Sequence, residues 1–144
     1  MSSQQDRVRD AFLAIDGERG VSASNGAPGF RIGLLGRGIG ASLTPIMHEA
    51  EGARLGLSYR YDLIDFDRLG LHDSDLETVI MTAQAHGYGG LNITYPFKQD
   101  VIPLLDSLAS EAAAIGAVNT IVLHQGSRIG HNTDCWGFAQ SLKV

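Results

Sequence analysis

The feature of this sequence that most limits its possible folds is a regular alternation of short apolar runs with longer amphipathic segments. The predicted strands cover residues 30–35, 58–64, 88–94, 117–123 and 128–131. The predicted helices cover 45–55, 74–86 and 106–115, and a last helix starts near residue 134. Strands separated by helices usually pair in parallel and carry helices on both faces. The sequence therefore predicts an α/β fold of three layers, with a mostly parallel sheet between helices.

One pair of predicted strands departs from the parallel arrangement. Residues 124–127, with the sequence HQGS, have the composition of a tight turn between strands 117–123 and 128–131. Two strands joined by such a turn must run antiparallel. We therefore expect the mostly parallel sheet to contain one antiparallel hairpin strand.

The residues before the first strand fall into two parts. Residues 4–15 carry Val8, Ala11, Phe12 and Ile15 at helical spacing, which predicts a short amphipathic helix that we expect to be peripheral. Residues 16–29 are rich in Gly, Ser, Ala and Asn and are typical of a flexible linker. The predicted organisation is a peripheral helix and linker over 1–29, a compact domain over 30–134, and the start of a further helix over 135–144.

Composition excludes several classes of protein. A chain of 144 residues suits a single domain, and no apolar run approaches the roughly 20 residues needed to span a bilayer. The net charge of −5, without a run of Lys or Arg, argues against nucleic acid as a partner. A single cysteine excludes an internal disulfide, and the scattered histidines lack metal-ligand spacing. Without a signal peptide, we expect a cytoplasmic protein with no metal site.

The stretch from residue 89 to residue 98, with the sequence GGLNITYPFK, is a short strand that ends in polar and basic side chains. Asn92 and Thr94 are two residues apart, so they point to the same face of an extended strand. Pro96 ends the strand because it lacks an N–H group, which leaves Lys98 at the mouth of a turn. Such a lysine can bind an oxyanion or transfer protons, although it can also be a solvated residue that opens a helix.

Two further polar clusters follow predicted secondary structure. Ser42 and Thr44 lie in the loop after the first strand, where hydroxyl groups beside a helix N-terminus can bind a carboxylate. Asn119 lies within a predicted strand, and a buried amide there needs a hydrogen-bond partner. Asp134 opens the last helix. Thr44 and Asp134 also have a simple structural explanation, because both are good N-cap residues.

The loop at residues 36–41, with the sequence GRGIGA, fits the dinucleotide-binding pattern G-x-G-x-x-A, with Asp62 or Asp65 downstream. In a genuine fingerprint the third small residue already lies in the helix. Here Thr44 and Pro45 place the helix start three or four residues later. The sequence favours a glycine-rich loop that lines a small-molecule pocket, and a small nucleotide-binding protein remains an alternative.

These motifs together resemble the shikimate dehydrogenase family over nearly all of residues 31–138. Residues 92–98 (NITYPFK), 116–120 (GAVNT) and 130–134 (GHNTD) resemble its three best signatures in order and spacing. The first loop, ASLTP at 41–45, departs from the common His-Ser-x-Ser-Pro pattern. It is similar to the quinate/shikimate dehydrogenase branch.

The resemblance implies an oxidoreductase of the shikimate pathway of aromatic amino acid biosynthesis, which moves a hydride between NAD or NADP and C3 of a small-molecule substrate. That substrate would be shikimate, 3-dehydroshikimate or quinate. Lys98 and Asp134 would be the catalytic acid/base pair. The residues that the resemblance implies in substrate binding are Ser42 and Thr44 for the carboxylate, and Thr94, Lys98, Asn119 and Asp134 for the ring hydroxyls.

The same resemblance implies a second domain. Family members continue past Asp134 through a linking helix into a nucleotide-binding domain, so the cofactor would be bound mainly by a domain absent from these residues. The 144-residue chain alone is then expected to be inactive. A non-catalytic binding module for a cyclic polyol carboxylate is the alternative reading of the same domain. Neither the choice between shikimate and quinate nor the oligomeric state follows from the sequence.

Overall fold

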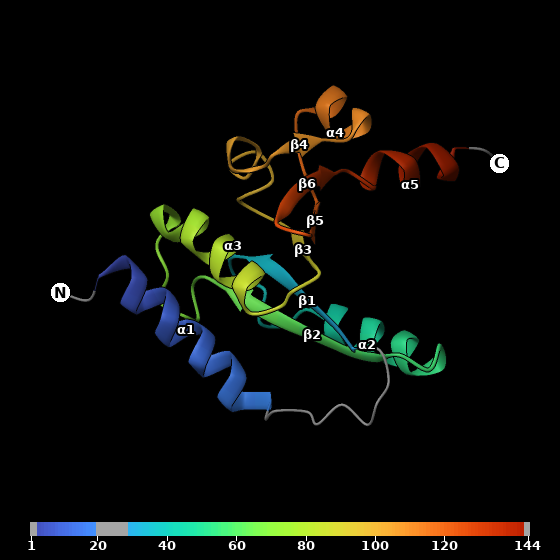
Figure 1. Ribbon diagram of the computed structural model, residues 1–144. Coiled ribbons are helices and arrows are strands. Elements are labelled where there is room, and N and C mark those ends of the chain that lie inside the picture. Colours follow the sequence, from blue (N-terminus) through green and yellow to red (C-terminus); the bar gives the residue numbers. More distant parts are fainter. Residues whose placement is uncertain (1–2, 20–28, 143–144) are drawn as a thin grey trace.

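The computed structural model describes residues 3–19 and 29–142, with the side chain of residue 135 excepted. These residues form a six-stranded sheet with the strand order β2-β1-β3-β5-β6-β4 (Figure 1). The strands are β1 (Gly29–Gly36), β2 (Ser58–Asp65), β3 (Gly90–Ile93), β4 (Ser107–Leu108), β5 (Thr120–His124) and β6 (Ser127–His131).

The strand directions confirm the predicted mixed sheet. Strand β1 pairs in parallel with β2 and β3, and β4 pairs in parallel with β6. Strand β5 runs antiparallel to both of its neighbours, β3 and β6. Because β5 is reversed, its first residue lies beside the last residues of its neighbours, β3 and β6. Asn119, just before β5, therefore lies beside the ends of β3 and β6, and its backbone N–H donates to the carbonyl of His131 at 3.0 Å.

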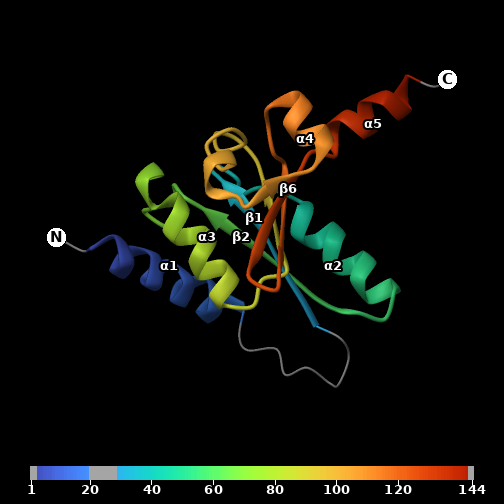
Figure 2. The ribbon, with the colours of Figure 1, turned by 45° about the horizontal axis from the view of Figure 1, so that its top comes forward.

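Helices cover both faces of the sheet, as predicted. They are α1 (Gln4–Arg19), α2 (Thr44–Arg54), α3 (Leu76–Ala85), α4 (Ser110–Ile115) and α5 (Asp134–Ser141). Figure 2 shows α1 and α3 on one side of β1 and β2, and α2 on the other. Successive residues of β2 follow this division: the Tyr61 ring lies 4.6 Å from the ring of His48 on α2, whereas Asp62 shares its arginine partner with Asp16 of α1.

Helix α1 is part of the core rather than peripheral. Val8, Ala11, Phe12 and Ile15 form the predicted apolar stripe, and all four are buried in the same cluster as the sheet residues. The Phe12 ring packs edge-on against Tyr88, with 6.0 Å between ring centroids. The helix also continues to Arg19, so the prediction that residues 16–19 belong to a linker is wrong. The rest of the predicted linker, 20–28, lies outside the described residues.

The segment predicted as one helix over 106–115 contains a strand and a shorter helix. Residues Ser107–Leu108 form β4 at the edge of the sheet, and α4 starts only at Ser110. The backbone N–H groups of Asp106 and Ala109 donate to carbonyls of Arg128 and Gly130, at 2.9 and 2.8 Å. At residues 107–108, backbone pairing with β6 is thus preferred over helix formation. Sequence periodicity alone does not reveal this preference, because it depends on a partner strand further along the chain. Of the helices in the described ranges, none is long and apolar enough to cross a membrane.

Candidate functional site

The centre of the candidate site is an ion pair between Lys98 and Asp134. Lys98 follows β3, Asp134 is the first residue of α5, and Lys98 Nζ lies 2.7 Å from Asp134 Oδ2. The hydrogen bond from Lys98 lowers the pKa of Asp134, against a smaller opposing effect of burial. Both side chains remain accessible, at 38% and 61% exposed. The pair can therefore reach a ligand.

Asn132 explains why Asp134 is available for this contact. The Asn132 side chain is buried; its Nδ2 donates to the carbonyl of Ala117 at 3.0 Å, and its Oδ1 accepts the backbone N–H of Asp134, also at 3.0 Å. Asn132 thus satisfies an N–H group at the start of α5, the capping role that the sequence also allows for Asp134. The Asp134 carboxylate can point toward Lys98 instead.

Asn119 adjoins the ion pair. Its Oδ1 accepts hydrogen bonds from the Thr133 backbone N–H at 3.1 Å and from Thr120 Oγ1 at 3.0 Å, and its Nδ2 donates to Thr133 Oγ1 at 2.9 Å. A hydrogen bond from Asn119 also contributes to the lowered pKa of Asp134. The structure therefore brings together three of the predicted residues: Lys98, Asn119 and Asp134.

Thr94 lies at the end of β3, against the glycine-rich loop. Its backbone N–H donates to the carbonyl of Leu35 at 3.0 Å. A Cβ atom at Gly36 would lie only 2.4 Å from Thr94 Cγ2 and 3.0 Å from the carbonyl oxygen of Tyr95. The first glycine of the loop is therefore required by the close approach of Thr94.

Ser42 and Thr44 form a pair at the start of α2. Ser42 Oγ donates to Thr44 Oγ1 at 2.8 Å and accepts the Thr44 backbone N–H at 3.3 Å. Thr44 is the first residue of α2 and makes no capping hydrogen bond, so its prediction as N-cap is wrong. Ser42 also lines a cavity of about 340 Å³ that extends to Arg19 of α1, and neither Lys98 nor Asp134 borders this cavity.

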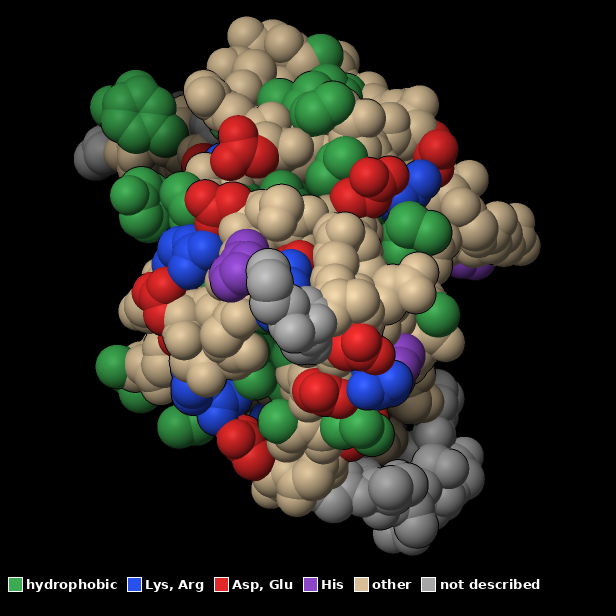
Figure 3. Space-filling model, turned by 90° about the vertical axis from the view of Figure 1, so that its left-hand side faces the viewer, with side chains coloured by type: hydrophobic (Ala, Val, Ile, Leu, Met, Phe, Trp, Pro, Cys, Tyr) green, Lys and Arg blue, Asp and Glu red, His purple; other side chains and the backbone are tan. Residues whose placement is uncertain are grey.

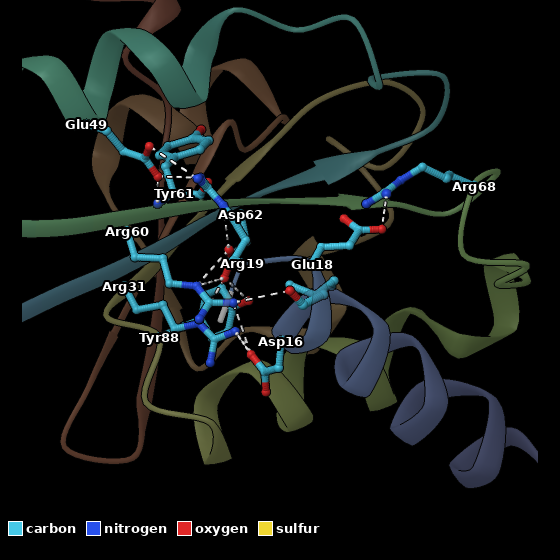
Figure 4. A network of polar contacts seen from close by, with 11 residues as sticks. Asp16, Glu18, Arg19, Arg31, Glu49, Arg60, Tyr61, Asp62, Arg68 and Tyr88 are labelled. Atoms are coloured by element: carbon cyan, nitrogen blue, oxygen red, sulfur yellow. Dashed lines mark hydrogen bonds and ion pairs between the residues drawn. The ribbon is translucent and has the colours of Figure 1, made fainter. Parts of the chain in front are cut away.

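The two aspartates of the alternative nucleotide motif have internal partners. Asp65 accepts the backbone N–H groups of Gly38 and Ile39 at 3.1 and 3.0 Å, so it holds the glycine-rich loop in place. Asp62 is 2% exposed and accepts hydrogen bonds from Arg31 and from the Tyr88 hydroxyl at 2.9 and 2.7 Å (Figure 4). Neither carboxylate is placed to bind a ribose, which argues against the nucleotide alternative.

The sequence interpretation missed the role of Tyr61. This residue of β2 is fully buried, and its hydroxyl donates to Asn92 Oδ1 at 2.9 Å. Its backbone N–H donates to Glu49 Oε1 at 2.9 Å, and its carbonyl accepts from Arg19 at 2.8 Å (Figure 4). The signal in the sequence is weak, because a tyrosine in an apolar strand is usually a packing residue.

Charged side chains on the face toward the N-terminus are mixed in sign. Figure 3 shows acidic and basic groups side by side on this face. Ion pairs of the described residues include Arg37 with Asp73 and Arg68 with Glu18. This arrangement is unlike the continuous basic surface that contacts a phosphate backbone.

Comparisons with known proteins identify the family of this chain. Residues 34–121 match the family model described as the shikimate dehydrogenase substrate binding domain. The chain is 52% identical over 113 residues to a shikimate dehydrogenase (NADP(+)) of Streptomyces avermitilis, covering 78% of this chain and 39% of that protein. It is 45% identical over 113 residues to a quinate/shikimate dehydrogenase (NAD(+)) of Corynebacterium efficiens, covering 78% of this chain and 40% of that protein.

Solved structures give the same picture. Quinate dehydrogenase from Corynebacterium glutamicum, in complex with NAD, superposes with a TM-score of 0.75 at 43% identity, over 81% of this chain and 42% of that one. A shikimate 5-dehydrogenase from Thermus thermophilus, in complex with NADP(H) and shikimate, superposes with a TM-score of 0.71 at 33% identity, over 79% and 41%. The chain thus spans about 40% of the length of these relatives.

Proposed function

We propose, because this chain belongs to the shikimate dehydrogenase family, that it is the substrate-binding and catalytic part of a shikimate or quinate dehydrogenase. The observation that carries the proposal is the Lys98–Asp134 ion pair with Asn119 beside it. We assign the substrate-binding domain to residues 30–134, and we assign 135–144 to the start of a helix that leads toward a nucleotide-binding domain. A cytoplasmic location and a pathway role in aromatic amino acid biosynthesis belong to the same proposal.

Lys98 would handle the proton of the reaction. Oxidation of a secondary alcohol removes a hydride from carbon and a proton from oxygen, so a proton acceptor must lie within hydrogen-bond reach of that oxygen. Lys98 in its neutral form would take the hydroxyl proton, and in the reverse direction its ammonium group would return the proton to the forming alcohol. Asp134 orients Lys98 and stabilises the positive charge that Lys98 gains.

NAD or NADP supplies the hydride chemistry when it is bound. The glycine-rich loop at 36–41 does not fit a dinucleotide site, since its Gly38 and Ile39 N–H groups already donate to the Asp65 carboxylate and are not available to a phosphate. We therefore propose that the cofactor is bound mainly by the part of the relatives' length that this chain does not cover.

The remaining predicted residues would position the substrate. Ser42 and Thr44, at the N-terminus of α2, offer hydroxyl groups and a partial positive charge to a carboxylate. Thr94 and Asn119 would contact ring hydroxyls. These contacts would place the C3 oxygen next to Lys98.

Calorimetric titration of the chain with shikimate, quinate and NAD, each separately, tests the proposal. We expect saturable binding of shikimate or quinate that weakens in Ser42→Ala and is unchanged in Ser74→Ala, whose exposed hydroxyl precedes α3. The tighter of the two ligands would identify the branch of the family. Heat with NAD alone would overturn the proposal in favour of nucleotide binding.

A chimera separates a catalytic domain from a non-catalytic binding module. In it, this chain replaces the matching residues of the Streptomyces avermitilis enzyme. We expect the chimera to oxidise shikimate or quinate with a nicotinamide cofactor, and to lose that activity in Lys98→Ala. A folded chimera that binds the ligand but never turns it over would identify a binding module.

A further inference from the structure

A row of four polar side chains crosses the sheet and ends at the candidate site. We call it the Tyr61 row, and it consists of Tyr61 on β2, Asn92 on β3, Thr120 on β5, and Asn119 just before β5. The Tyr61 hydroxyl reaches across β1 to Asn92 Oδ1 at 2.9 Å, and Asn92 Nδ2 lies 3.2 Å from Thr120 Oγ1. Thr120 Oγ1 lies 3.0 Å from Asn119 Oδ1. The row thus connects a buried tyrosine to a predicted substrate ligand.

The hydrogen bonds of the row can run in one direction only. The backbone N–H of Thr133 is always a donor, so the group that faces it at 3.1 Å must be the carbonyl oxygen of the Asn119 amide. The Thr120 hydroxyl has a single proton, which it must donate to this same oxygen. Thr120 Oγ1 can then only accept from Asn92, which requires Asn92 Nδ2 to face it.

Tyr61 completes this order. With its Nδ2 toward Thr120, Asn92 turns its Oδ1 toward Tyr61, and the phenolic O–H donates to it. If the Asn92 amide turned over, its oxygen would face Thr120, and the Thr120 proton would go to Asn92 instead of Asn119. Asn119 would then lose one of the two donors that hold its Oδ1.

Two donors to Asn119 Oδ1, the Thr133 backbone N–H and the Thr120 hydroxyl at the end of the row, determine what Asn119 offers to a ligand. Because Oδ1 is occupied by two donors, only the N–H₂ group can face a ligand; one of its protons goes to Thr133 Oγ1 at 2.9 Å, and a ligand oxygen would take the other one, beside Asp134. An amide donor selects an acceptor oxygen, such as that of a hydroxyl or carbonyl group on the substrate ring. The same N–H₂ group contributes to the hydrogen bonding of Asp134.

We propose that Tyr61 is a positioning residue of the candidate site, which acts through Asn92 and Thr120 to hold the Asn119 amide with its N–H₂ group toward the substrate. The assignment of Asn119 as a substrate ligand rests on the proposed function. The ordering of the row is a property of the unliganded chain and is tested without substrate.

Tyr61→Phe is the variant that isolates the phenolic hydroxyl, because it keeps the buried ring. Tyr59→Phe is a matched control on the same strand and face: its hydroxyl lies 3.4 Å from an exposed His48, outside the row. Thr120→Val breaks the row in its middle, and Thr120→Ser restores the hydroxyl there. Thermal unfolding of each variant identifies any that does not fold. If Tyr61→Phe does not fold, the comparison of Thr120→Val with Thr120→Ser tests the inference instead.

The experiment uses the ¹⁵N-labelled 144-residue chain and records the side-chain amide signals of Asn92 and Asn119 by NMR. We expect Tyr61→Phe and Thr120→Val to shift the Asn119 amide signals and to speed their hydrogen exchange, whereas Tyr59→Phe and Thr120→Ser leave both unchanged. In titrations with shikimate and quinate, we expect Tyr61→Phe to weaken binding by about three- to tenfold, the value of one ordinary hydrogen bond.

Each outcome has a distinct meaning. Unchanged Asn119 signals in folded Tyr61→Phe and Thr120→Val would overturn the inference, whatever the chain binds. Shifted signals with unchanged affinity would overturn the positioning role and leave the proposed function standing. Shifted signals in a chain that binds neither ligand would support the ordering of the row and count against the proposed function.

Discussion

Lys98 Nζ and Asp134 Oδ2 lie 2.7 Å apart although 36 residues separate them in the chain. The fold accounts for the meeting. Lys98 follows the end of β3, Asp134 follows the end of β6, and the reversed strand β5 lies between these two strands. Asn119 comes just before the start of β5, so it lies near the carboxyl ends of β3 and β6. Three side chains from distant parts of the sequence are thereby brought together at the carboxyl ends of these two strands.

Lys98→Ala should separate function from stability. The pair is exposed enough that its loss should change the free energy of unfolding by less than about 1 kcal/mol. In the chimera, loss of the acid/base group should reduce kcat by about 100-fold or more. Chemical denaturation and steady-state kinetics measure the two effects, with Gln99→Ala as the control at an exposed neighbouring position. An unchanged kcat in Lys98→Ala would remove this residue from the acid/base role.

The ion pair should also have a signature in pH. Because Lys98 lowers the pKa of Asp134 below the ordinary aspartate value of 3.8, the pair stabilises the folded chain above that pH. This contribution disappears as the pH falls through the lowered pKa of the folded state. NMR titration of the Asp134 carboxyl carbon should give a pKa below 3.8, which rises in Lys98→Met. The same pKa in both proteins would contradict the pairing.

Helix α1 should be indispensable to the domain. The Phe12 side chain has 0% exposure, whereas the adjacent Leu13 is 61% exposed on the same helix. Phe12→Ala should lower the free energy of unfolding by about 3–5 kcal/mol, because it leaves a cavity beside Tyr88. Leu13→Ala should have little effect. Urea denaturation of the two variants compares them directly, and similar stabilities would return α1 to the peripheral role that its sequence predicts.

Substitution of Asp62 should destabilise the chain far more than substitution of an exposed acidic residue of α1. Its side chain is 1% exposed and lies 2.9 Å from both Arg31 Nε and Arg60 Nε. Asp62→Ala removes the carboxylate that two partly buried guanidinium groups share, and should cost about 3–5 kcal/mol of stability. Asp10→Asn breaks an exposed pair with Arg9 and should cost less than about 1 kcal/mol. Equal effects in urea denaturation would contradict this ranking.

Much of the fold could be predicted from local patterns. The apolar runs around Leu35, Ile64 and Leu91 did identify buried strands, and the turn at 124–127 did identify the antiparallel hairpin. Such patterns depend on neighbours in the chain, which the sequence displays directly. The family signatures at 92–98 and 116–120 likewise lie in the segments that match the family model.

The features that could not be predicted depend on contacts between distant residues. Strand β4 forms because β6 offers it backbone partners, and α1 is buried because Phe12 meets Tyr88, which lies far along the chain. Strand β4 leaves no periodic signal, and the apolar stripe of α1 predicts an amphipathic helix without identifying the residues that bury it. The Tyr61 hydroxyl likewise gains its importance from Asn92, a residue on a strand that is not its neighbour in the sheet.

Strand β2 ends the sheet on one side, and a bare edge of this kind can recruit strands from other molecules. At Tyr61 the outward-facing backbone groups are occupied: Glu49 accepts the N–H and Arg19 donates to the carbonyl. A foreign strand would have to displace both side chains, which also bind each other, before it could pair at this position. Glu49 and Arg19 therefore block edge-to-edge pairing at this position. Substituting both with alanine would free the Tyr61 N–H and carbonyl to pair with a strand of another molecule.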